Sequence, residues 1–384
     1  MILTSQSKNL VDAARLFGLN ARQIFMRLIL PMIRPAAIAG VAIVVMEALA
    51  NYATAEYFGV QTLSVAVFKV WLGLGSLGGA AQLSLIILTF TVLIVSIEKA
   101  ARKRISYYNQ GCHPPLRAVY PLRGAKVIAA WLICGLPVIL GFVIPLVQLS
   151  VWAHRYGTEK FDSEYLELMF NSVTLGLGAA LIVVFIATIM AYGQRLHPSP
   201  KWQWIDKLAT SGYAIPGVVI AIGVLIVNTT VEGLVNKSLA ALDYSSLGLF
   251  LSGTVIALLF AYTVRFMTLG YNTIASSLTK VSPNIDYVAS SCGVSKLKML
   301  RLIHIPLIRS GLLSAALLIF ADVVKELPAT LVLRPFEFNT LSIRTYELAS
   351  TERINDIAVP SLSIVAISLL SIMLVAQRIA AYRK

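Results

Sequence analysis

The sequence predicts an all-α polytopic membrane protein with about eight transmembrane helices in two homologous repeats, the first of them incomplete. Three observations support this prediction. Apolar residues make up 58% of the 384 residues and charged residues only 13%, and the mean hydropathy is +0.79, far above that of a soluble domain of this length. Apolar runs long enough to cross a bilayer recur along the chain. One stretch of the sequence occurs twice.

The apolar runs define the candidate spans. Each span is expected to be helical, because backbone polar groups in lipid must be satisfied within their own segment. A proline in the fifth run, Pro216, predicts a kink there, and Trp131 and Trp152 lie near the two ends of the third run, as in an aromatic belt. In chain order the runs are residues 35–56, 80–98, 127–151, 171–192, 208–230, 247–269, 310–333 and 358–377.

The repeated stretch is a loop of one recognisable design. Gly18 and Gly293 are 275 positions apart, and Pro31 and Pro306 are separated by the same 275. A fixed period of this kind indicates duplicated architecture. Each copy has small residues, a glycine that permits a sharp bend, a basic amphipathic turn, and a proline in the first turn of a long apolar helix. The pattern predicts a short surface helix, a bend and re-entry into the bilayer; an ordinary loop between spans is the alternative.

The repeat also sets the expected domains. Residues 1–110 are expected to be the C-terminal part of a first repeat, with its loop and two spans. Residues 111–384 are expected to be a complete second repeat of six spans, with its loop at residues 283–309. Four spans precede the loop in the second repeat and none precedes it in the first. The chain is therefore expected to be truncated at its N-terminus relative to a symmetrical parent.

The net charge of +14 follows the membrane topology. If the first loop is cytoplasmic, 24 of the 32 Lys and Arg residues lie on that side, in residues 1–34, 99–126, 193–207, 265–309 and 378–384. Positive residues favour the cytoplasmic side, so both loops and the C-terminus are expected in the cytoplasm. Nucleic acid is not an expected partner, because it would need a basic face free of the bilayer.

The repeated loop resembles the EAA motif in the membrane subunits of binding-protein-dependent ABC importers. The leading glutamate of that motif is Asp12 in the first copy and is replaced by Tyr287 in the second. The resemblance implies a MetI-like ABC permease fold, a multi-pass location in the bacterial inner membrane, a cytoplasmic ATPase dimer that grips both loops, and an extracytoplasmic binding protein that delivers the substrate. The loop positions that it assigns to ATPase coupling are Asp12, Ala13, Ala14, Gly18, Leu30, Pro31, Val288, Ala289, Gly293, Ile305 and Pro306.

A second stretch is similar to the permeases of ferric-iron importers, which have two fused repeats. It reads KELPAT at residues 325–330, LRP at 333–335 and NTL at 339–341. The resemblance implies ferric iron as the cargo, moved by alternating access. Permeases for thiamine, sulfate and phosphonates share the architecture and remain alternatives. A truncated remnant that does not transport also remains an alternative. An ion-driven secondary transporter is a weaker alternative, because such a carrier does not need two loops that bind an ATPase dimer.

Charged side chains inside spans are unfavourable in lipid and indicate function by default. Asp322, Lys325 and Glu326 are expected to share one face of the seventh span, where the lysine could pair with either carboxylate. Glu47 occupies the position of Asp322 in the first repeat. These four residues are candidates for a transport pathway, and a structural ion pair between helices is the alternative.

The sequence does not predict an enzyme. It has no G-x-x-x-x-G-K-[ST] motif, so ATP hydrolysis would come from a separate ATPase chain. The G-x-G-x-x-G at residues 73–78 lies between two spans rather than after a strand, which argues against nucleotide binding. Histidines and cysteines are scattered, so no metal site and no cofactor are expected. His304, within the second loop, is expected to be an interface residue.

Overall fold

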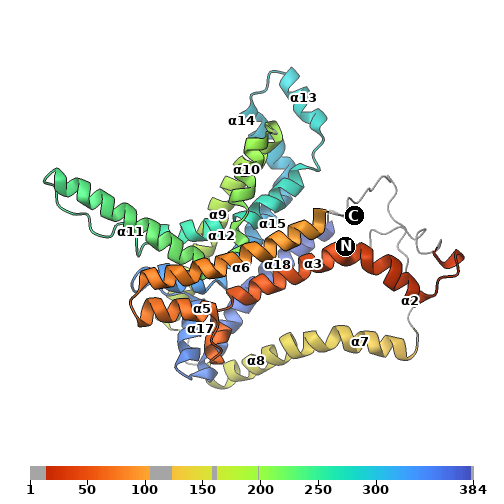
Figure 1. Ribbon diagram of the computed structural model, residues 1–384, viewed down its shortest axis with the longest axis horizontal. Helices are drawn as coiled ribbons and strands as arrows, with labels where there is room; N and C mark the ends of the chain where they lie inside the picture. Colours follow the sequence, from red (N-terminus) through yellow and green to blue (C-terminus); the bar gives the residue numbers. More distant parts are fainter. Residues whose placement is uncertain (1–13, 104–122, 158–161, 198, 382–384) are drawn as a thin grey trace. The chain divides into compact units, whose positions relative to one another are not determined.

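The computed structural model describes residues 14–103, 123–157, 162–197 and 199–381, and these residues form helices and connecting turns without a strand (Figure 1). Among them, seven helices are long and apolar enough to cross a membrane. The predicted all-α polytopic fold is therefore confirmed. The seven segments are Leu77–Ile97, Ala125–Tyr156, Ser163–Leu196, Gly217–Ala241, Val255–Leu278, Lys296–Val324 and Ile354–Gln377.

The chain forms two compact units. One combines the residues up to Leu49 with Thr89–Pro145, and the other combines Ala50–Leu88 with Leu146–Lys384. The larger, second unit contains most of the buried core. The boundary predicted at residue 110 lies in residues 104–122, outside the described part of the chain.

The first 156 residues supply the following described elements. They are α2 (Ala21–Ile24), η1 (Phe25–Ile29), α3 (Leu30–Ala50), α4 (Ala53–Tyr57), α5 (Leu63–Phe68), η2 (Lys69–Gly73), α6 (Leu77–Lys103), α7 (Ala125–Val138), η3 (Ile139–Val143) and α8 (Ile144–Tyr156). The rest are α9 (Ser163–Leu196), α10 (Pro200–Ala209), η4 (Gly212–Ala214), α11 (Gly217–Ala241), α12 (Val255–Leu278), α13 (Pro283–Ser291), α14 (Lys296–Met299), η5 (Leu300–His304), α15 (Ile305–Val324), α16 (Pro328–Leu333), α17 (Leu341–Ser350), η6 (Ile354–Ile357) and α18 (Ala358–Ala381).

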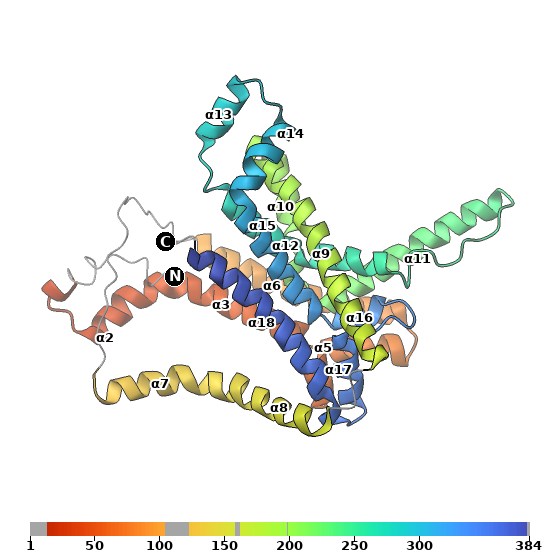
Figure 2. The same ribbon diagram turned by 180° about the vertical axis from the view of Figure 1, so that it is seen from behind.

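The core of the second unit is a bundle of α9, α12, α15 and α18, seen from two sides in Figures 1 and 2. Val183, Ile274 and Ile319 are fully buried between these helices. Gly270 of α12 allows the close approach, because a Cβ there would lie 2.8 Å from the Val183 side chain. In lipid the hydrophobic effect does not drive helices together, so helix association depends on close van der Waals packing, which small residues at the contact permit.

The local structure repeats with the sequence. The five-residue π-helical turns η1 and η5 begin 275 positions apart, as do α3 and α15, and so do α4 and α16. The helices α5 and α17 begin 278 positions apart, as do the threonines that precede them, Thr62 and Thr340, so the second copy has three extra residues between α16 and α17. The two copies therefore share the starting points of these elements as well as their sequence pattern.

The repeated prolines are the second residues of α3 and α15, in the first turn as the sequence predicts, but each of these α-helices continues directly from an earlier helical turn. The uninterrupted helical run that contains Pro31 begins at Ala21 with α2, and the run that contains Pro306 begins at Lys296 with α14. In each, a π-helical turn precedes the proline. A proline in a helix removes one hydrogen bond and crowds the carbonyl four residues earlier, and the wider π turn accommodates this.

Several predicted spans were misplaced at their ends. Pro216 caps the start of α11 rather than kinking a span, so residues 208–216 lie before that helix. The sixth span begins at Val255, where Thr254 Oγ1 accepts the N–H of Ala257, and not at residue 247. The first predicted span, at residues 35–56, corresponds to α3, whose apolar part is Gly40–Ala50.

Candidate functional site

The two repeated loops share one backbone design. In the second, α13 ends in a glycine turn at Gly293, where φ is +73°, and in the first, Gly18 has φ +76°. In both copies the residue after the glycine donates its N–H to the carbonyl of a buried alanine. Val294 donates to Ala289 at 3.0 Å, and Leu19 donates to Ala14 at 3.2 Å. This is a Schellman-type cap, which needs a left-handed residue and so favours glycine. Asp12 and Ala13 lie outside the described residues.

A cluster of ionisable side chains holds the second loop on the bundle. The Arg195 guanidinium, at the end of α9, donates through Nε to Asp286 Oδ2 at 2.7 Å. It also donates to the carbonyls of Leu278 at 2.6 Å and Val281 at 2.9 Å. His304 Nε2 lies 2.9 Å from the other oxygen of Asp286. One arginine thus joins the end of α9, the end of α12 and the start of α13.

Two further contacts fix the turn into α14. The Tyr192 hydroxyl donates to the carbonyl of Lys296 at 2.8 Å, and its ring lies 5.2 Å from that of His304. Lys296 Nζ and His197 Nε2 are 2.8 Å apart. His304 is fully buried, so the expectation that it is an interface residue is wrong: it packs inside the loop, against Asp286 and Tyr192.

The outer surface of this loop is apolar and basic. Val288 and Leu297 are exposed, at 64% and 76%, and so are the basic residues Lys298 and Arg301. Ala289 beneath them is buried, and Ile305 is 37% exposed. In the first loop Leu30 is exposed in the same way. Such a surface is suited to a protein partner that brings both apolar and acidic groups.

The intramembrane charges do not form the predicted set. The helix ends at Val324, with Lys325 as its cap, and Pro328 starts a new helix, α16. Lys325 Nζ pairs with Asp322 Oδ1 at 2.9 Å. Glu326 lies beyond the helix and pairs instead with Arg265, so the prediction that all three share one helical face is wrong.

Arg265 and Glu326 form a buried ion pair. Arg265 Nη1 and Glu326 Oε1 are 3.0 Å apart, and the two side chains are 12% and 6% exposed. Glu326 Oε1 also accepts the N–H of Ala329 at 3.1 Å, which caps α16. A Cβ on Gly217, the first residue of α11, would lie 1.9 Å from Arg265 Nη1. The pair therefore joins α12 to the turn before α16, and a side chain at residue 217 would have to displace one of its two charged groups.

Glu47 lies on α3 and is exposed. Its place in the repeat matches Asp322, as the sequence indicates. The residue that matches Glu326 is Asn51, whose Oδ1 accepts the N–H of Thr54 at 3.2 Å. The first repeat thus keeps the capping hydrogen bond and lacks the charge.

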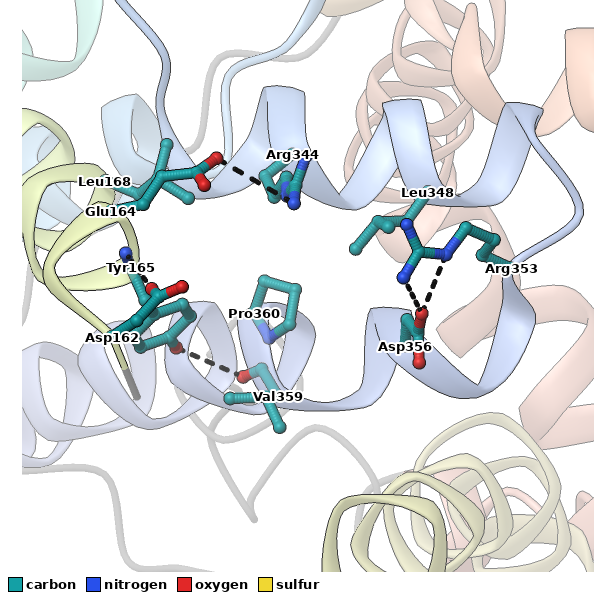
Figure 3. A pocket seen from close by; sticks show the side chains of 10 residues that line it. All are labelled: Asp162, Glu164, Tyr165, Leu168, Arg344, Leu348, Arg353, Asp356, Val359 and Pro360. Carbon is teal, nitrogen blue, oxygen red and sulfur yellow. Dashed lines mark hydrogen bonds and ion pairs between the residues drawn. The ribbon is translucent and has the colours of Figure 1, made fainter. Parts of the chain in front are cut away.

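A polar pocket lies at the opposite end of α9 from Arg195 (Figure 3). Its volume is about 150 Å³, which matches a cavity that admits one benzene ring and is below the range of about 300–1,000 Å³ for drug-sized ligands. There is room for one side chain or a small ion. The lining comes from the start of α9, from α17, from η6 and from the start of α18: Asp162, Glu164, Tyr165, Leu168, Arg344, Leu348, Arg353, Asp356, Val359 and Pro360.

The two arginines of this pocket are held differently (Figure 3). Arg353 Nε donates to Asp356 Oδ2 at 2.8 Å. Among the described side chains, Arg344 makes a long contact of 3.8 Å to Glu164, which is 64% exposed. An exposed pair of this kind contributes about 0–1 kcal/mol. A new carboxylate could therefore replace Glu164 on Arg344 at little cost.

The sequence left three of these residues unassigned. Arg265 was counted in a cytoplasmic segment, yet it lies in the middle of α12. Asp286 directly precedes Tyr287, which replaces the leading glutamate of the EAA motif. An acidic residue beside that replaced glutamate was the signal in the sequence that could have identified Asp286. Arg195 meets it from 91 residues away, and no local pattern reports such a contact. Within the described residues, no group of three His, Cys, Asp or Glu side chains is placed to hold a metal ion.

Comparison with known proteins identifies relatives of this chain. Residues 1–107 match the family described as "Binding-protein-dependent transport system inner membrane component". The Fe(3+)-transport system permease protein FbpB 2 of Haemophilus influenzae is 26% identical over 357 residues, which cover 91% of this chain and 67% of that protein. A putative 2-aminoethylphosphonate transport system permease protein, PhnV of Salmonella typhimurium, is 27% identical over 207 residues, 54% of this chain and 72% of the relative.

Solved structures share the fold. A bacterial alginate ABC transporter in complex with an alginate pentasaccharide-bound periplasmic protein aligns with a TM-score of 0.51 at 13% identity, over 66% of this chain and 92% of that one. A second structure of an alginate-importing ABC transporter aligns with the same TM-score at 12% identity, over 67% and 94% of the two chains. At this identity the likeness concerns the fold alone.

Proposed function

Because this chain is a membrane subunit of the binding-protein-dependent ABC importer type and not an enzyme, we propose that it moves ferric iron through the bacterial inner membrane by alternating access. The observation that carries the proposal is the pair of loops with one cap geometry, at Gly18 and Gly293. Two equivalent cytoplasmic docks suit a dimeric ATPase. Ferric iron is favoured over other cargo because the ferric relative aligns over 91% of the chain.

The two repeated loops are the proposed ATPase docks. The exposed apolar residues Val288 and Leu297 would enter a groove on the ATPase, and Lys298 and Arg301 would meet acidic groups around it. The Arg195 cluster makes the second loop rigid with respect to α9 and α12. ATP-driven movement of the loop would therefore be transmitted to these helices rather than lost in bending of the connection.

The extracytoplasmic end is proposed from the length of α9. Its 34 residues span about 51 Å at 1.5 Å per residue, whereas the hydrocarbon core is about 30 Å thick. With Arg195 on the cytoplasmic side, the first turns of α9 and the pocket in Figure 3 project outward. The same orientation returns α18 to the cytoplasm with the C-terminus. We assign the pocket to the binding protein, with Arg344 taking a carboxylate from it.

The pathway is proposed to pass Asp322 and Lys325. Both are only partly shielded, with side chains 21% and 58% exposed, whereas Glu326 is buried against Arg265. Glu326 is thus a structural residue rather than a pathway group. If iron is the cargo, a carboxylate such as Asp322 offers the hard oxygen ligand that ferric iron prefers, while the binding protein would supply most of the selectivity.

Uptake of radiolabelled ferric iron tests the cargo. The chain would be expressed with the ATPase and binding protein of its own system, and 2-aminoethylphosphonate uptake would be measured in parallel because of the second relative. Iron uptake that requires ATP supports the proposal. Phosphonate uptake without iron uptake would show that the cargo is a phosphonate, and the proposal of an ATP-driven importer would still stand.

Arg344 tests the docking pocket. Arg344→Glu should raise the concentration of loaded binding protein needed for half-maximal uptake and leave the maximal rate near that of the wild type, because only docking is weakened. Lys237→Glu is the control: it makes the same change of charge, and Lys237 lies on α11 and does not line the pocket. Equal effects of the two substitutions would remove Arg344 from the docking surface.

A further inference from the structure

The helix α10 connects two candidate spans and has two unlike sides. Trp204 and Leu208, one helical turn apart, are 65% and 69% exposed, and Ile205 beside them is 47% exposed. Asp206, on the other side, is only 7% exposed. Residues four apart lie on one face of a helix, so α10 presents an apolar stripe away from the protein.

Positive charges flank this stripe. Lys207 Nζ lies 5.4 Å from the centre of the Trp204 ring, and Lys201 is exposed in the first turn. The one acidic residue of the helix, Asp206, is turned inward and accepts the Tyr271 hydroxyl at 2.6 Å. The exposed charges of α10 are therefore both positive.

The protein side of α10 is fastened to the bundle. Tyr271, which bonds Asp206, belongs to α12, and Thr268 Oγ1 of the same helix donates to the carbonyl of Thr210 at 2.7 Å. Trp202 faces α9, where a Cβ on Gly193 would lie 3.9 Å from its ring. The helix lies at the same end of α9 as α14 in both views (Figures 1 and 2). This is the end where Arg195 and Tyr192 hold the second repeated loop.

We propose that α10 lies in the cytoplasmic interface of the bilayer and binds anionic phospholipid, with Trp204, Ile205 and Leu208 among the acyl chains and Lys201 and Lys207 on phosphate groups. Short segments link α10 to α9 and α11, both long enough to span, so the helix is confined near the membrane surface. Tryptophan is enriched at that depth, and a helix with an apolar face and flanking lysines lies in the interface plane. The anchor would steady the ends of α9 and α12 that carry the second repeated loop.

The test uses the purified chain alone, in nanodiscs of phosphatidylcholine and phosphatidylglycerol in equal parts, with either lipid brominated to quench tryptophan fluorescence. The signal of Trp204 is the difference between the wild type and Trp204→Phe. Trp202→Phe is the matched control, since the Trp202 ring faces α9 and the residue is 36% exposed, against 65% for Trp204. We expect brominated lipid to quench the Trp204 signal much more than the Trp202 signal.

The headgroup preference is read from the two brominated lipids. Each basic residue near an anionic surface contributes about 1 kcal/mol, so two lysines should give a preference for phosphatidylglycerol of about 10-fold or more. Lys201→Gln with Lys207→Gln should reduce it to near unity while Trp204 stays quenched. A Trp204 signal that lipid does not quench, or that falls only when an ATPase is added, would overturn the proposal. Quenching without a headgroup preference would overturn the anionic site. Neither outcome depends on the cargo, so a failure of iron transport is distinguishable.

Discussion

Replacing Gly217 by alanine should break the buried ion pair between Arg265 and Glu326. The new Cβ would lie 1.9 Å from Arg265 Nη1 and 2.5 Å from Glu326 Oε1, and one of the two charged groups must move. Breaking a buried pair costs about 3–5 kcal/mol. Alanine regains at most about 1 kcal/mol of helix propensity over glycine. We therefore expect a net loss of about 2–4 kcal/mol in the free energy of unfolding.

The assay is unfolding of the purified chain in mixed micelles with increasing dodecyl sulfate, followed by circular dichroism. Gly223→Ala is the control, since Gly223 lies in the same helix and nothing lies within 4 Å of its Cβ position. That variant should be as stable as the wild type or slightly more so. If Gly217→Ala were as stable as Gly223→Ala, the ion pair would not restrain α11. Glu326→Gln leaves Arg265 without its charge partner. Its free energy of unfolding tests the same ion pair if the Gly217→Ala protein does not accumulate in the membrane.

Three further changes test the loops and the pathway. Gly293→Ala forces a residue with a side chain to φ +73° and should destabilise the second repeated loop by about 1–2 kcal/mol, visible as faster amide hydrogen exchange in α13 and α14. Arg195→Met removes the partner of Asp286 and should make amide hydrogen exchange in α13 and α14 faster still. The variant should still insert into the membrane but no longer stimulate the ATPase. Unchanged exchange would show that the cluster does not hold the loop. Lys325→Met should abolish uptake while insertion and assembly persist, and normal uptake by that variant would exclude Lys325 from the pathway.

The long helices were predictable because lipid imposes one rule on every span. Backbone groups in the bilayer must bond within their own helix, so apolar length alone locates α9 and α18. The ends of the spans were less predictable. The run that begins at residue 247 is apolar, yet Gly248 and Gly253 adopt positive φ, and Glu232 accepts the N–H groups of Leu251 and Ser252, both at 2.6 Å. These bonds keep the segment out of α12.

The misplaced end hid an intramembrane charge. Starting the sixth span at 247 moved its end to residue 269 and left Arg265 at the cytoplasmic edge, where a positive charge needs no explanation. With α12 at Val255–Leu278, Arg265 lies in mid-span, where a charge requires a partner. Hydropathy cannot find that partner, because Glu326 is 61 residues away. Only the folded chain brings the two together.

The ionisable residues that distinguish the second repeat replace neutral ones at the matched positions of the first. Asp286 and His304 correspond to Val11 and Ile29, 275 residues earlier, and Glu326 corresponds to Asn51. Asn51 and Glu326 both cap a short helix, at 3.2 Å and 3.1 Å, so the backbone hydrogen bond belongs to the shared architecture. The charge was not needed for that bond. It serves contacts particular to the second repeat, with Arg265 for Glu326 and with Arg195 for Asp286.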